Sequence, residues 1–260
     1  MIDLHERLSE FSFGYGVTRE VEGLLASVGL RPTPFLPSLL HEGELGFDVK
    51  FEDPGRVVVL QFKLGQELGR FHRATPSQSI PLLHRPFWRY RVDTTGHQFQ
   101  LLVDYETRQS DVYYVAPRFS TWQFYEQAFQ ENVLENSLLL KPSEISRGIS
   151  AQAGAPGVHR IVYDRLGRYV CSDPVELHEQ RPRELAAEIA KKVRSTETSL
   201  RHQIERLISR PATDDGPRFA PVRRERLFAK AKRPIDAMAA MVGIEAWSQG
   251  AQVIFVSDHD

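Results

Sequence analysis

Hydrophobic and polar positions follow two different patterns in the segment at 46–63. In GFDVKFE (46–52), aromatic and valine residues alternate with charged residues, which is the period-2 pattern of a strand with one buried face. RVVVLQFK (56–63) is β-branched and almost wholly apolar, as expected for a central strand that is covered on both faces. The DPG at 53–55 is a turn signal. The segment therefore predicts a β-hairpin.

Apolar residues at intervals of three and four predict several helices. Thr18 is a suitable N-cap for a helix at 17–29, and Ser120 or Thr121 for a helix at 120–135. Helices are expected at 1–11, 17–29, 120–135, 182–210 and 234–247.

Short aromatic and β-branched runs between turn residues predict further strands. They are expected at 87–93, 97–106, 111–117 and 251–257, and on both sides of the turn at 164–167. The proline-rich stretch at 31–37 excludes a helix and should be an extended loop. A short helix with a loop is expected at 64–85, and a connection at 142–146. Mixed strands and helices indicate the α/β class.

Composition and charge restrict the partners and the cellular compartment that we expect for the protein. The 260 residues carry a formal net charge of −1, so any affinity for nucleic acid must come from local patches. A single cysteine, Cys171, cannot form an internal disulfide and is expected to be a small core residue. No apolar run reaches the roughly 18–20 residues that span a bilayer, and the N-terminal segment lacks the apolar region of a signal peptide. These features predict a cytoplasmic protein without a membrane partner.

Polar residues at the ends of the predicted hairpin suggest a metal site. If the hairpin closes at 53–55, Asp48 lies close to the level of Gln61, and Glu44 enters just before the first strand. Carboxylate and amide oxygens are ligands that suit Mg²⁺ or Mn²⁺. Lys63, one step along the same face, would orient an attacking water or offset charge at a phosphate.

This arrangement resembles the PD-(D/E)XK nuclease superfamily, and in particular its Mrr-like branch with a Gln-x-Lys motif. Asp48 matches the first acid of the motif, and Gln61-Phe62-Lys63 matches the (D/E)-x-K. The strand-then-helix pattern at 111–129 is also similar, and Glu20 falls where many members carry an additional acidic ligand. The resemblance covers residues 12–135. The chain departs from the motif where Phe47 replaces the proline and Gln61 replaces a carboxylate.

The resemblance implies a mixed central sheet flanked by helices, in a restriction-endonuclease-like core over residues 1–146. Residues 64–100 would be an inserted segment, and 147–260 a mostly helical C-terminal region with short strands. It implies a Mg²⁺- or Mn²⁺-dependent endonuclease that hydrolyses phosphodiester bonds in DNA, in restriction or anti-phage defence. Asp48, Gln61 and Lys63 would be catalytic. The expected metal ligands are Asp48, Gln61, Glu44 and Glu20.

Two other interpretations of the same residues stay open. The first is a nuclease-like subunit that has lost catalysis and serves in nucleic-acid binding or assembly. The second is that the charged residues at 48–52 simply form the solvent face of an edge strand, with Lys63 as a gatekeeper at the strand end.

Nucleic-acid contacts are expected from two basic segments. HRPFWRYR (84–91) interleaves arginines for phosphates with aromatic rings for bases, although the pattern is more typical of a strand with an aromatic core face and an arginine solvent face. Residues 216–234 carry seven lysines and arginines against one glutamate, which suits a phosphate-contacting patch and equally a solvated helix flank. The candidate contact residues are Arg85, Trp88, Arg89, Arg91, Arg223 and Arg224. The apolar stripe at 185–207 also allows a homodimer or a contact with another defence protein.

Overall fold

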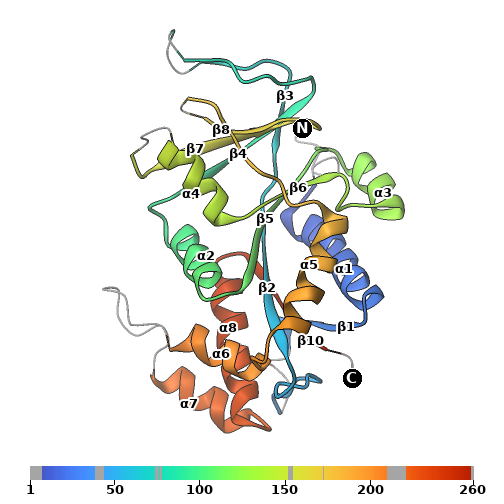
Figure 1. Ribbon diagram of the computed structural model, residues 1–260, viewed down its shortest axis with the longest axis vertical. Coiled ribbons are helices and arrows are strands. Elements are labelled where there is room, and N and C mark those ends of the chain that lie inside the picture. The colour runs from blue at the N-terminus through green and yellow to red at the C-terminus, as the bar shows by residue number, and fades with distance from the viewer. Residues whose placement is uncertain are drawn as a thin grey trace, which may run out of the picture. The chain divides into compact units, whose positions relative to one another are not determined.

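The computed structural model describes residues 8–38, 44–73, 76, 78–151, 155–171, 173–209 and 221–258. In these residues the chain forms an α/β protein with two sheets (Figure 1). The helices are α1 (Glu10–Ser27), α2 (His97–Thr107), α3 (Trp122–Glu131), α4 (Pro142–Ala151), α5 (Pro182–Ser195), α6 (Leu200–Ile208), α7 (Pro221–Lys230) and α8 (Pro234–Ser248). The strands are β1 (Leu30–Pro34), β2 (Gly55–Phe62), β3 (Gln66–Leu68), β4 (Phe87–Asp93), β5 (Asp111–Pro117), β6 (Ser137–Leu140), β7 (Val158–Tyr163), β8 (Arg168–Cys171), β9 (Val175–Glu176) and β10 (Ala251–Asp258).

The two sheets have five strands each. One has the order β1-β10-β2-β5-β6, and the other has the order β3-β4-β7-β8-β9. Every neighbouring pair in the second sheet is antiparallel. The α/β class predicted from the sequence is therefore confirmed. None of the helices in the described ranges is long and apolar enough to cross a membrane.

The chain divides into two compact units that interleave along the sequence. The first unit takes its residues from Met1–Val21, Leu60–Glu106 and Val112–Leu185, and the second takes the rest. Each unit therefore draws on both sides of residue 146, where the sequence suggested a division.

The first unit contains the antiparallel sheet and the strand ends that carry the candidate site. Strand β5 is buried along its whole length, and Tyr114 stacks on Phe99 of α2 and on Tyr90 of β4, with ring centroids 6.4 and 6.3 Å apart. Thr121 caps α3 by accepting a hydrogen bond from the backbone N–H of Phe124. Cys171 is buried, as expected of a core residue, and burial raises the pKa of its thiol to about 12.

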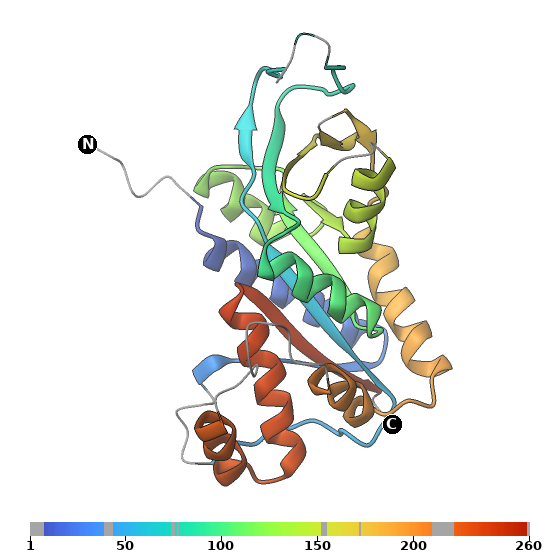
Figure 2. The same ribbon diagram turned by 90° about the vertical axis from the view of Figure 1, so that its left-hand side faces the viewer.

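The second unit is organised around α8. This helix packs on β10 and also contacts α6 and α7 (orange to red in Figure 2). Its residues are buried almost all round, which suits a helix enclosed by its own domain. Phe255 of β10 packs edge-on against Phe47, with ring centroids 5.6 Å apart.

The predicted hairpin at 46–63 is wrong in its first half. Strand β2 forms as expected, but residues 46–53 are irregular, and the strand order shows β10 and β5 beside β2. The backbone of this segment is bound by the start of α8: Phe47 N–H donates to Asp236, and Arg233 donates to the Phe47 carbonyl at 2.9 Å. Those side chains take the hydrogen bonds that a partner strand would have supplied. The alternation of apolar and charged residues still predicts burial correctly, because Phe47, Val49 and Phe51 are buried.

Two other element predictions are wrong for local reasons. Residues 97–107 form α2 rather than a strand, since Phe99, Leu102 and Tyr105 are buried at helical spacing. The long helix expected at 182–210 is broken at 196–199. Ser199 caps α6 there, and the Leu200 N–H donates to the Asp53 carbonyl at 2.9 Å.

Smaller differences concern element boundaries. Helix α1 begins at Glu10, so Thr18 lies inside the helix and is not its N-cap. The short helix expected at 64–85 is absent from the described part of that segment, where β3 forms instead, and 142–146 opens α4. The proline-rich segment is extended as expected and forms edge strand β1. Most of the helix expected at 1–11 lies outside the described residues.

Candidate functional site

The end of β2 carries two of the predicted catalytic residues. Gln61 is 2% exposed, and Lys63 follows the strand directly, with its Nζ donating to Gln98 Oε1 at 2.7 Å. Burial lowers the pKa of the Lys63 ammonium, and the nearby charge of Glu10 acts in the opposite direction. A partly buried lysine of this kind is common at functional sites and in structural ion networks.

Two of the other predicted metal ligands, Glu20 and Glu44, have structural partners. Glu20 accepts hydrogen bonds from the backbone N–H groups of Val133 and Leu134, at 2.5 and 2.8 Å. Glu44 pairs with Lys232 at 3.4 Å, and both side chains are mostly exposed. Asp48 and Glu44 belong to the second unit, whereas Glu20, Gln61 and Lys63 belong to the first.

Neither unit gathers the set of ligands that Mg²⁺ would need from these residues. Within the described ranges, no group of three or more histidine, cysteine, aspartate or glutamate side chains is placed to hold a metal ion. Both oxygens of the Glu20 carboxylate already accept backbone N–H groups. The residues of each unit taken alone therefore do not fit the metal that the family resemblance implies.

The predicted nucleic-acid contacts fall into buried and exposed groups. Trp88 is 4% exposed and belongs to the aromatic core face of β4, which leaves little of its ring for stacking on a base. Arg89 donates to Gln66 Oε1 at 2.6 Å, while Arg91 is exposed. Arg223 and Arg224 are exposed on α7. The second interpretation of 84–91, an aromatic core face with an arginine solvent face, describes β4 correctly.

Arg85 opens onto a cleft of about 810 Å³ in the first unit. The segment before β4, the turn between β7 and β8, and helix α3 supply its walls. Its lining residues include His84, Arg85, Asp164, Arg165, Phe124 and Glu67. Because β4 and β7 are antiparallel with Trp88 opposite Tyr163, the residues that precede β4 and follow β7 meet at one end of the sheet.

His84 and Asp164 form the central polar pair of this cleft. The His84 ring Nδ1 lies 3.1 Å from Asp164 Oδ2, and the backbone N–H of His84 donates to the same oxygen. Oδ1 of Asp164 accepts the N–H groups of Leu166 and Gly167, each at 2.6 Å. Burial alone would raise the pKa of Asp164, but the hydrogen bonds from Gly167, His84 and Leu166 outweigh it and lower the pKa. Asp164 is thus a fixed carboxylate beneath a mostly exposed imidazole.

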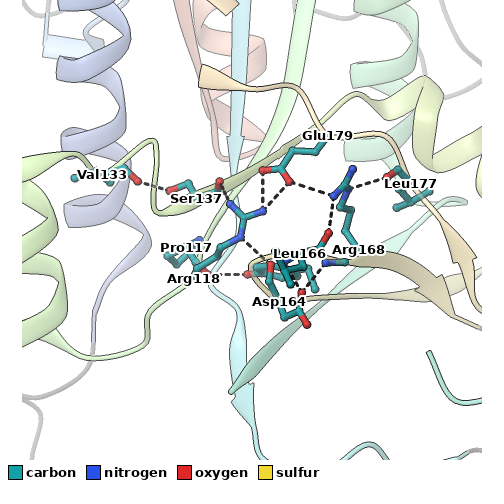
Figure 3. A network of polar contacts seen from close by, with 11 residues as sticks. Pro117, Arg118, Val133, Ser137, Asp164, Leu166, Arg168, Leu177 and Glu179 are labelled. Carbon is teal, nitrogen blue, oxygen red and sulfur yellow. Dashed lines mark hydrogen bonds and ion pairs between the residues drawn. The ribbon is translucent and has the colours of Figure 1, made fainter. Parts of the chain in front are cut away.

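An arginine network holds the turn that carries Asp164 (Figure 3). Arg118 donates from Nε to the Asp164 carbonyl at 2.9 Å, and from Nη2 to both oxygens of Glu179 at 2.7 and 2.8 Å. Its Nη1 donates to the Ser137 carbonyl. Arg168 donates to the carbonyls of Leu166 and Leu177, each at 2.9 Å. The network ties the β7–β8 turn to Ser137 of β6 and to Glu179.

The exposed groups around the cleft favour an anionic ligand with a flat apolar part. Arg85 and Arg165 line the cleft as exposed residues with guanidinium groups, and Glu67 lines it as an exposed residue with a carboxylate. Phe124 adds a ring that is 57% exposed. Guanidinium groups bind phosphate oxygens through paired hydrogen bonds, and an exposed ring can stack on a flat heterocycle.

Of the residues that line the cleft, the sequence singled out Arg85 and Trp88 as candidate contacts, but not Asp164, Arg165 or Phe124. Asp164 was seen only as a turn residue, although an aspartate three residues before a glycine is typical of a carboxylate that accepts turn N–H groups. Its pairing with His84, 80 residues away, left no local signal. The roles of Arg118 and Glu179 were missed for the same reason.

Comparison with known proteins finds no family model, no curated protein and no solved structure that matches this chain. The resemblance to the PD-(D/E)XK superfamily therefore stays a prediction from the sequence motif.

Proposed function

We propose that this protein binds single-stranded nucleic acid in the cleft of the first unit. The observation that carries the proposal is the grouping of Arg85, Arg165 and His84 with the exposed ring of Phe124 around one cleft of about 810 Å³. The net charge of −1 gives the chain no general attraction for polyanions, so binding depends on this local group.

The chemistry of the cleft suits a nucleotide chain better than a simple anion. Arginine forks bind phosphate oxygens, and their attraction supplies most of the affinity for a nucleic-acid backbone. A base stacked on Phe124 would add about 1–3 kcal/mol. A paired duplex hides its base faces in the stack, so the exposed ring favours an unpaired strand.

The test measures binding of a labelled 12-nucleotide single strand by fluorescence anisotropy at low salt, with EDTA present. Arg85→Gln and Arg165→Gln should each weaken binding several-fold, and Phe124→Ala about 5- to 150-fold, the equivalent of the stacking energy. Arg183→Gln is the matched control, because this arginine is 88% exposed in the same unit and does not line the cleft. Absence of binding, or equal weakening by the control, would contradict the proposal.

A second candidate function is the cleavage of DNA that the Gln-x-Lys motif at Gln61 and Lys63 implies. Its support is the burial of Gln61 and the lowered pKa of Lys63 at the end of an otherwise apolar strand. Lys63→Met should abolish cleavage without unfolding the protein, whereas Lys50→Met, on an exposed lysine, should not. Cleavage that persists in Lys63→Met would reject this candidate and leave the binding function in place.

A further inference from the structure

The contact between His84 and Asp164 decides which nitrogen of the neutral imidazole carries the proton. Asp164 is 1% exposed at its side chain and faces Nδ1 of His84, whose own side chain is 64% exposed. A carboxylate accepts only, so Nδ1 carries a proton, and in the neutral imidazole Nε2 has the free lone pair. A histidine oriented in this way by a buried aspartate has the form of a general base.

We infer that His84 is a general base that cleaves RNA bound in the cleft. This inference rests on the proposed nucleic-acid binding and names the substrate class as ribonucleic acid. His84 is a catalytic residue under this inference, and Asp164 is a positioning residue that acts through it.

The reaction requires no reactant beyond the RNA. Nε2 of His84 takes the proton of a 2′-hydroxyl, and the 2′-oxygen attacks the adjacent phosphorus, forming the O2′–P bond. The P–O5′ bond breaks, and the leaving 5′-oxygen takes a proton from solvent while His84 returns its proton to solvent. The products are a 2′,3′-cyclic phosphate and a 5′-hydroxyl end. No electrons are transferred to or from another molecule.

The choice of RNA follows from the catalytic groups that the cleft offers. General-base catalysis by one imidazole contributes about 10²- to 10⁴-fold, which is small compared with the barrier to attack by water on a phosphodiester. The 2′-hydroxyl is an intramolecular nucleophile, and well-oriented intramolecular groups reach effective concentrations of about 10⁵–10⁸ M. DNA lacks this group, so the same pair of residues should leave DNA intact.

Other groups in the cleft suit the same reaction. Arg85 and Arg165 line it as exposed guanidinium groups, which can stabilise the extra negative charge on the phosphorus centre. The N–H groups of Leu166 and Gly167 donate to the Asp164 carboxylate, and Arg118 donates to the Asp164 backbone carbonyl. The carboxylate is therefore held in place before any substrate binds.

The experiment compares an end-labelled RNA strand with the DNA strand of the same sequence, in EDTA. The full-length protein should cut the RNA, leave the DNA intact and release 2′,3′-cyclic phosphate ends that mass spectrometry identifies. An RNA with one 2′-deoxy nucleotide should resist cleavage at that position only. Cleavage of both strands, or cleavage that requires a divalent ion, would overturn the inference.

His84→Asn and His84→Ala separate the base from its structural role. Asparagine retains an N–H donor toward Asp164 but cannot take a proton, so His84→Asn should keep the thermal stability and lose about 10²- to 10⁴-fold in rate. Added imidazole should restore part of the activity of His84→Ala. His202→Asn is the matched control, since His202 is 62% exposed and lies 4.0 Å from Glu205 in α6.

For the positioning residue, Asp164→Asn should lower kcat by a larger factor than it lowers the affinity for the uncleavable DNA strand. A purely structural role would lower the stability and the affinity together. Wild-type rates in both His84 variants would overturn the inference.

The two proposals fail in different ways. If the protein binds the DNA strand with the dependence on Arg85 and Phe124 described above but does not cut RNA, the inference is wrong and the binding function stands. If neither strand binds, the proposed function itself is wrong.

Discussion

Arg118 shows how one buried side chain can hold a site together. Its side chain is 8% exposed and that of its partner Glu179 is 14% exposed. Their bidentate contact lies among backbone carbonyls that accept the remaining donors. A pair of this kind contributes to position more than to net stability, because desolvation of both charges offsets much of their attraction.

Removal of Arg118 has a larger effect, because the mostly buried carboxylate of Glu179 then keeps the more distant Arg168, 3.9 Å away, but loses its bidentate contact. We predict that Arg118→Met lowers the free energy of unfolding by about 3–5 kcal/mol, as measured by urea denaturation. Arg183→Met is the control: Arg183 also pairs with a glutamate, Glu135, at 3.1 Å, but its side chain is 88% exposed. It should cost about 0–1 kcal/mol. Equal losses in the two variants would mean that burial does not set the strength of the Arg118 contact.

At the scale of elements, α8 shows tight packing around a glycine. A Cβ atom added at Gly243 would lie 2.3 Å from the ring of Phe35, which is fully buried. Gly23, on α1, would meet nothing within 4 Å. The two glycines lie inside helices, where glycine is otherwise less favourable than alanine.

The same substitution should therefore have opposite effects at the two positions. We predict that Gly243→Ala destabilises by about 1–3 kcal/mol through overpacking against Phe35. Gly23→Ala should stabilise by about 0.5–1 kcal/mol, because alanine loses less backbone entropy. Thermal denaturation of the two variants measures whether each substitution raises or lowers the stability of the protein. A stabilised Gly243→Ala would show that α8 and Phe35 can move apart at little cost.

Most elements could be predicted because their patterns are local. Strands β2, β5 and β10 and helices α3 and α8 appear close to where the sequence placed them. The failures occurred where tertiary contacts decided the backbone conformation. The segment at 46–53 has the alternation of a strand, but the side chains of Arg233 and Asp236 take its hydrogen bonds.

At the scale of the whole molecule, positive and negative charges nearly cancel, but their distribution over the surface is uneven. The formal net charge is −1, yet Arg85 and Arg165 are both exposed at one cleft. Binding of a nucleic acid should therefore depend on a few local phosphate contacts.

We predict that binding of the single strand weakens with salt at a slope of about −0.7 in log K against log salt for each phosphate contacted. The double variant Arg85→Gln, Arg165→Gln should reduce the slope by about 1.4, for two lost contacts. Anisotropy titrations between about 50 and 200 mM salt measure it. An unchanged slope would place the phosphate contacts elsewhere, for example on the basic face of α7.

The sequence by itself determined the α/β class, the buried central strand and the buried cysteine. These features depend on the composition and periodicity of short segments, so they can be inferred from the sequence without knowledge of tertiary contacts. Only the tertiary structure decided which residues share a site. Asp48 does not lie in a hairpin strand, because Asp236 of α8 accepts a hydrogen bond from the backbone of its segment. His84 lies beside Asp164 because β4 and β7 pair with Trp88 opposite Tyr163. Strand register between distant segments depends on the packing of the whole unit, so no short stretch of sequence contains it.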